Sequence, residues 1–256
     1  MREVDSVRPR RHAVMRQSKL VRVSGLTTLA SMAMFLMVLT VIAVGVAREG
    51  VEFSDIAPPL TPHSLSAFFK LRAYFWPAAW LALVSIFLMA LTPIGLSHAL
   101  HRSAALTQAA TVLFYAGLAA GLVHVSFQSL VQTAIASRYA AAPPSVKEAY
   151  YALGAVFYDV NDFFEKAWGI ARAASVVLYT LSTLRVAVFP GWAIWVGVVG
   201  SVELVYRMPT IALNRPSGGV QDLFFTVWLI GLGVAMLHFQ DPDELAGNDH
   251  EAAGTQ

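Results

Sequence analysis

Residues 159–207 read DVNDFFEKAWGIARAASVVLYTLSTLRVAVFPGWAIWVGVVGSVELVYR. Two apolar segments of membrane length flank a Pro190-Gly191 break, and each contains a charged residue, Arg172 in the first and Glu203 in the second. Charged side chains inside a membrane are costly, so they usually face protein and pair with one another. Arg172 and Glu203 lie almost equally far from the break, so an antiparallel hairpin would place them at the same depth. The stretch therefore predicts a transmembrane hairpin held by an ion pair between these two residues.

The composition of the whole chain indicates a membrane protein. Of its 256 residues 57% are hydrophobic and 13% are charged, and the mean hydropathy is +0.59. These values are too apolar for an ordinary soluble domain. The formal net charge of +2 is too small for a nucleic-acid-binding surface, and the absence of cysteine excludes disulfides and cysteine nucleophiles. We expect one membrane domain whose principal partner is the lipid bilayer, with no nucleic-acid partner.

Six apolar segments are long enough to cross a hydrocarbon core of about 30 Å at about 1.5 Å per residue. They are residues 24–47, 78–100, 104–137, 163–184, 192–213 and 223–239. The first could be a signal peptide, but it is longer than the apolar core of about 7 to 15 residues that signal peptides contain. The predicted fold class is therefore an all-α bundle of six transmembrane helices. We expect Pro77 to open the second span and Pro93 to kink it.

An amphipathic helix is predicted outside the membrane, between the third and fourth spans. Apolar residues recur there at spacings of three and four, which is typical of a helix with one apolar face. These residues are Val146, Tyr150, Leu153, Phe157, Val160 and Phe164. The helix either lies on the membrane surface or extends the fourth span outward.

The number of spans predicts on which side of the membrane the two termini and their tails lie. Six spans place both termini on one side, and seven lysines and arginines in residues 1–23 predict that this side is the cytoplasm. We expect a basic cytoplasmic tail over residues 1–23, a transmembrane domain over 24–239, and an acidic, disordered cytoplasmic tail over 240–256.

With these features the chain resembles a bacterial family of integral membrane proteins that is catalogued only as a domain of unknown function. The features that carry the resemblance are the six-span plan, the long polar loop before the fourth span, Phe189-Pro190-Gly191-Trp192, Gly197, Gly200 and Trp228-Leu229-Ile230-Gly231. The resemblance covers most of residues 24–239. It implies a location in the bacterial cytoplasmic (inner) membrane, and it supplies no catalytic residues.

Polar residues at helical spacing predict a pocket within the bundle. On the third span, His124 and Gln128 continue a face that begins with Gly117 and Gly121. Such side chains are expensive in lipid, so the face borders either a neighbouring helix or an aqueous cavity. We predict a ligand-binding pocket in the outer half of the bilayer, lined by His124, Gln128, Glu165, Arg172, Tyr179, Glu203 and Arg207. The alternatives are a hydrogen-bonded packing seam on the third span and a structural ion pair that fixes helix register. Glu203 has two possible partners, Arg172 across the hairpin and Arg207 four residues further on.

No catalytic motif is recognised, and we expect neither a metal nor another cofactor. Haem b is the alternative cofactor, because a helical bundle can hold it between two histidines. His98 and His101 lie at a different depth from His124, whereas His238 lies at a better depth for His98. A zinc site would lack a third ligand at a matching depth.

The leading functional prediction is a non-enzymatic accessory or ligand-binding component of the membrane. The faces that carry Gly117 with Gly121 and Gly197 with Gly200 would serve internal packing, a partner membrane protein or a homo-oligomer. The first alternative is a carrier for a small anionic or amphipathic solute, with Arg172 receiving the anionic group. The second is a lipid-modifying membrane enzyme with His124 as its general base and Glu165 or Glu203 as partner.

Overall fold

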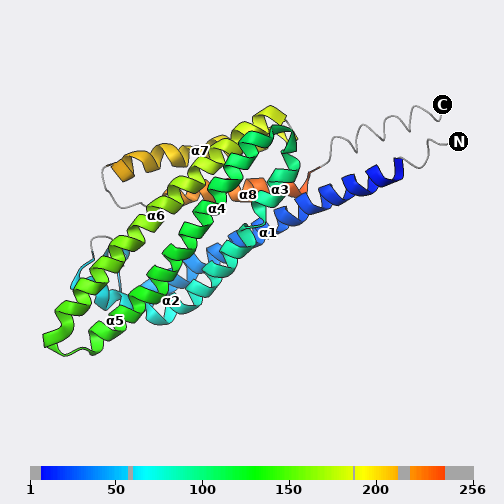
Figure 1. Cartoon of the computed structure of the whole chain (residues 1–256). Helices are drawn as coiled ribbons and strands as arrows, with labels where there is room; N and C mark the ends of the chain where they lie inside the picture. Colours follow the sequence, from blue (N-terminus) through cyan, green and yellow to red (C-terminus); the bar gives the residue numbers. More distant parts are fainter. Residues whose placement is uncertain (1–6, 57–59, 187, 213–219, 240–256) are drawn as a thin grey trace.

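The structure is a computed structural model that describes residues 7–56, 60–186, 188–212 and 220–239. The side chains of residues 7–17, 210–212, 220 and 221 are outside this description, as is the predicted acidic tail. Throughout the described part every regular element is a helix (Figure 1). The longer ones are α1 (Val7–Glu49), α2 (Pro62–Met89), α3 (Thr92–Ala99), α4 (Ala104–Ser126), α5 (Gln132–Ala141), α6 (Pro144–Val186), α7 (Gly191–Ala212) and α8 (Val220–Leu237).

Three short helical segments are also present in the described residues. The segment η2 (Phe53–Ile56) follows α1, and η3 (His101–Ser103) precedes α4. A π-helical segment, η4 (Phe127–Val131), joins α4 to α5 without a break in the helix. The wider π turn is a local irregularity that often accompanies functional sites.

Successive long helices run back and forth along one axis. The end of the bundle where α6 meets α7 is called the α6–α7 end, and the end where α5 meets α6 is called the α5–α6 end (Figure 1). The first and last helices meet at the α6–α7 end. There Arg22 of α1 donates a hydrogen bond of 3.1 Å to the backbone carbonyl of Phe239, which follows α8. Further along, Gly25 of α1 lies against Gly233 of α8, so the two backbones approach closely.

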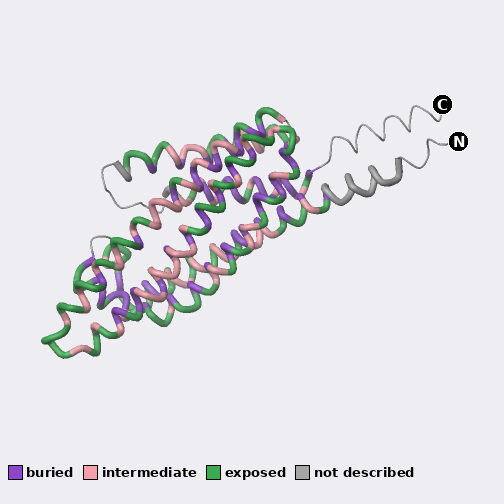
Figure 2. Tube along the Cα trace, viewed as in Figure 1, coloured by how far each residue is buried: buried purple, intermediate pink, exposed green. Residues whose placement is uncertain are grey.

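Helix length divides the bundle into two parts. Helix α6 has 43 residues and is about 65 Å long, whereas α7 with 22 and α8 with 18 residues are about 33 and 27 Å long. Helix α6 therefore extends well beyond the α7–α8 pair towards the α5–α6 end. Buried residues run along the inside of the bundle, and exposed ones predominate at the α5–α6 turn (Figure 2).

Two apolar cores correspond to these two parts. The larger core joins α1, α2, α3, α4, α6 and α8, and it includes Phe114, Tyr179 and Trp228. The second core lies at the α5–α6 end, where Phe68 and Leu71 of α2 pack with Ile135 of α5. The α7–α8 pair thus covers only the part of the bundle that contains the larger core.

Local sequence explains most of the helix boundaries. Thr61 and Ser64 form a capping box that begins α2, and Pro62 occupies the first turn, where its missing N–H costs nothing. The predicted kink at Pro93 is confirmed as an interruption between α2 and α3. The prediction that Pro77 opens a span is wrong, because Pro77 lies inside α2 and the helix begins at Pro62.

The fold class is confirmed at the level of an all-helical protein with apolar helices of membrane length. Three stretches of the described chain are long and apolar enough to cross a membrane: Ser18–Glu49, Pro62–Ala99 and His101–Ala141. Asp222–Leu237 is apolar but shorter. Helix α6 includes the fourth predicted span and continues from it towards the α5–α6 end, so the predicted amphipathic segment extends that helix. Helix α1 begins at Val7, within the segment predicted as a tail.

Candidate functional site

The predicted ion pair between α6 and α7 is present in the interior of the bundle. Arg172 donates from Nε and Nη2 to Oε1 of Glu203, at 2.9 and 2.6 Å. Arg172 is 3% exposed and Glu203 is completely buried. The Pro190-Gly191 break before α7 turns the chain back, which brings the two side chains to the same height as the sequence predicted.

Two further charged residues join this pair. Arg207 donates from Nε to the same Glu203 oxygen at 2.7 Å, so both partners considered for Glu203 bind it at once. Asp222, in the first turn of α8, accepts hydrogen bonds at Oδ1 from Arg172 and, at 3.0 Å, from Nη2 of Arg207. We call these residues (Arg172, Glu203, Arg207 and Asp222) the four-charge cluster. Its two cations and two anions cancel, which lowers the cost of burying them.

The two carboxylates of the cluster have different surroundings. Glu203 is enclosed, and its Oε2 atom accepts no hydrogen bond from any group in the described part of the chain. The side chain of Asp222 is 43% exposed. A buried carboxylate oxygen without a hydrogen-bond donor is unusual in proteins. Asp222 is therefore the accessible acid of the cluster and Glu203 the enclosed one.

Aromatic and small residues hold the arginines in place. The Arg172 guanidinium lies between the rings of Trp168 and Phe225, 4.7 and 4.6 Å from their centroids. Such cation–π contacts are strongest where water is excluded. On the same turn of α6, Gly169 faces the guanidinium of Arg207, and a Cβ atom there would overlap it. Gly169 thus lets Arg207 reach across from α7.

His124 lies beside the cluster, one layer nearer the α5–α6 end. It is 8% exposed, and its ring centroid is 5.7 Å from that of Trp168, whose indole in turn packs on Gly121. The ring lies near the backbone of Asn161 and within electrostatic range of Glu165 and Asp222. Its Nδ1 atom has no hydrogen-bond partner among the described residues. His124 is therefore an indirect neighbour of Arg172, through Trp168.

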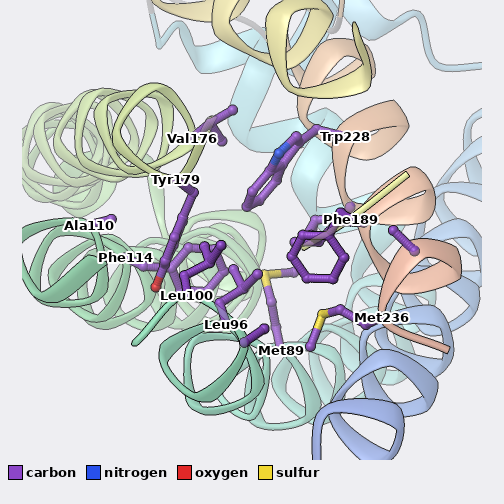
Figure 3. Packing of buried hydrophobic residues seen from close by; sticks show 14 of the residues in the cluster. Met89, Leu96, Leu100, Ala110, Phe114, Val176, Tyr179, Phe189, Trp228 and Met236 are labelled. Atoms are coloured by element: carbon purple, nitrogen blue, oxygen red, sulfur yellow. The ribbon is translucent and has the colours of Figure 1, made fainter. Parts of the chain in front are cut away.

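Tyr179 lies two turns of α6 away from Arg172, towards the α6–α7 end. Its hydroxyl is 2.9 Å from Oγ1 of Thr111, and its ring stacks on Trp228 at a centroid distance of 6.2 Å. The rings of Phe114 and Tyr179 pack edge to face, with their centroids 6.4 Å apart (Figure 3). These rings form an aromatic layer between the four-charge cluster and the α6–α7 end. Tyr179 belongs to that layer and makes no contact with the charges.

Of the seven residues predicted to line one pocket, three are in direct contact: Arg172, Glu203 and Arg207. His124 is adjacent through Trp168, and Glu165 and Gln128 are half-buried nearer the α5–α6 end, Gln128 on the π-helical segment. The sequence reasoning missed Asp222, Trp168 and Gly169. An acid in the first turn of a span that otherwise lacks charge was the available signal for Asp222.

A small void adjoins the exposed side of the cluster. Its volume is about 10 Å³, enough for about one water molecule. Arg172, Asp222 and Thr226 are its polar lining residues, and the apolar side chains of Met32, Phe35 and Met89 also line it. Among the described residues, no group of three or more histidines and acids is arranged to hold a metal ion. The cluster thus borders a small space that is lined mainly by apolar side chains.

Comparison with known proteins adds no relative. No family model matches the chain, and neither a curated protein nor a solved structure matches it. The resemblance to a bacterial membrane family therefore stays a prediction.

Proposed function

We propose that this chain is a non-enzymatic membrane protein that binds the anionic group of a small amphipathic solute at Arg172 and Arg207. In this proposal it has six spans in the bacterial inner membrane, with both termini in the cytoplasm. The contact between Arg22 and Phe239 supports an even number of crossings, because it holds the first and last helices together at one end. Arg172 then lies about 21 Å from the α6–α7 end, deep in the bilayer.

The observation that carries the proposal is the position of Asp222. It bridges the two arginines, yet its side chain is 43% exposed, while Glu203 is enclosed behind them. A carboxylate or phosphate from a solute could take the place of Asp222, because planar guanidinium groups bind such anions with two hydrogen bonds. Glu203 would stay in place and keep the arginines oriented.

The apolar wall of the void supports an amphipathic solute over a purely ionic one. Met32, Phe35 and Met89 line the same void as Arg172 and Asp222. Methionine side chains are flexible and polarizable, so they can move aside for an alkyl chain of variable shape. Opening the void would allow an apolar tail to lie between α1, α2 and α8 with its anionic end on the cluster.

Binding of octanoate and of its neutral analogue octanamide tests this proposal. Thermal unfolding of the full chain in a mild detergent is followed with increasing probe, below the concentration at which the probe forms micelles. We expect octanoate to raise the melting temperature and octanamide to have little effect. Arg207→Gln removes one cation of the site and should abolish the octanoate effect, whereas Arg138→Gln, at an exposed position in α5, should keep it. Equal effects of octanoate and octanamide would contradict the proposal.

A carrier is the second candidate, and one observation favours it. Beyond the aromatic layer, hydroxyl groups continue towards the α6–α7 end, where Thr111 links Tyr179 at 2.9 Å to Ser97 at 3.2 Å. Such groups could accompany a polar solute past the layer. Uptake of octanoate into proteoliposomes that is lost in Glu203→Gln, with binding retained, would favour a carrier over a binding component.

A further inference from the structure

A second basic site lies at the α6–α7 end, away from the four-charge cluster. There a surface hollow of about 390 Å³ is lined by Arg102 and Ser103 of η3, by Leu106 near the start of α4, and by Arg185 at the end of α6. Both arginines are exposed. The hollow falls within the range of about 300 to 1,000 Å³ that is usual for small-molecule sites.

The chemistry of the hollow suits a phosphate group. Two guanidinium groups from separate segments line one space, and each can donate two parallel hydrogen bonds to phosphate oxygens. Guanidinium groups are also more weakly hydrated than ammonium groups, so they give up water more readily on binding. The pair therefore places two guanidinium groups beside one space that an anion could occupy.

The surface next to the hollow is apolar. Val112, two turns along α4 from Ala105 in the hollow, is 68% exposed. On α6, Leu184 and Leu181 lie within one turn of Arg185 and are 51% and 43% exposed. A basic hollow continued by exposed aliphatic side chains matches a phospholipid, whose phosphate is followed by acyl chains. Basic pockets between helices at the cytoplasmic end are known to suit anionic headgroups.

We infer that this hollow binds the phosphate of an anionic phospholipid, with the acyl chains lying along the exposed apolar faces of α4 and α6. The inference rests on the chain being a membrane protein, and it is independent of the proposed solute site at Arg172. A lipid held here would join η3 to the end of α6 at the point where the helices leave the bilayer.

Native mass spectrometry of the full chain in detergent tests the inference. Phosphatidylglycerol and phosphatidylcholine with identical acyl chains are titrated, and the bound lipid is counted. We expect phosphatidylglycerol to bind more tightly than phosphatidylcholine. Arg102→Gln and Arg185→Gln should each weaken its binding about fivefold, as expected for one cation near a charged surface. Both positions are exposed, so these variants should fold normally.

Two controls distinguish this site from non-specific attraction of anionic lipid to basic side chains and from a site for free phosphate. Lys19→Gln removes a cation from an exposed position at the same end, and it should leave binding unchanged. A loss in Lys19→Gln equal to that in Arg102→Gln, or full binding in the Arg102→Gln/Arg185→Gln double variant, would overturn the inference. Soluble glycerol phosphate should compete only weakly. Competition at the same concentration as the lipid would show a free-phosphate site and overturn the lipid assignment.

Discussion

Replacing Arg172 by glutamine should destabilise the protein more than any single change on its surface. The change removes two hydrogen bonds to Glu203, at 2.9 and 2.6 Å, and one to Asp222. It also leaves the cluster with two carboxylates and one cation in a buried site. Breaking a buried pair in this way costs about 3 to 5 kcal/mol, mostly because the remaining charge is uncompensated.

A double-mutant cycle isolates the interaction itself. Glu203→Gln alone leaves two arginines and one carboxylate, so it should also cost about 3 kcal/mol. The Arg172→Gln/Glu203→Gln double variant keeps the neutral pair of Arg207 and Asp222. It should therefore be more stable than the two single effects together imply, by about 2 kcal/mol.

The cycle is measured by reversible unfolding in mixed micelles with increasing sodium dodecyl sulfate. Arg138→Gln, at an exposed position of α5, serves as the control and should stay within about 0.5 kcal/mol of the unchanged protein. Additive single effects, or an Arg172→Gln variant as stable as the control, would refute the reasoning that the pair is buried and mutually compensating.

Two further changes test the surroundings of the cluster. Gly169→Ala should destabilise the protein by about 1 to 3 kcal/mol in the same unfolding assay, because the new methyl group overlaps the Arg207 guanidinium; Gly191→Ala, which meets open space, should have little effect, and equal stability of the two variants would contradict the contact. Tyr179→Phe removes the hydrogen bond to Thr111 and should cost about 0.5 to 1.5 kcal/mol without changing the octanoate response; a lost response would place Tyr179 in the binding site after all.

The hairpin pair could be predicted from sequence because two strong constraints coincide. A charge in an apolar segment needs a partner, and equal spacing about a Pro-Gly break supplies one at the right height. Arg172 and Glu203 satisfy both conditions. Helix extent was also largely predictable, since long runs without charge leave few alternatives in a membrane.

The remainder of the site depends on contacts between helices that a single sequence does not reveal. Tyr179 shares a helical face with Arg172, but a separation of seven residues is about 10.5 Å along the axis, which puts the two in different layers. Asp222 lies at the margin of the last apolar segment, one residue before the predicted start of the sixth span. Its role, and that of Gly169, appears only when α7 and α8 are placed against α6.

The affinity of the Asp222→Asn variant for octanoate is the most direct measure of the central claim. If a solute anion takes the place of the Asp222 carboxylate on Arg172 and Arg207, removing that carboxylate leaves a site with a net positive charge and no internal competitor. Asp222→Asn should therefore be less stable than the unchanged protein without octanoate, bind octanoate more tightly, and regain stability when it binds. Weaker octanoate binding by Asp222→Asn than by the unchanged protein would contradict the claim, because Asp222 would then help to hold the ligand or the site.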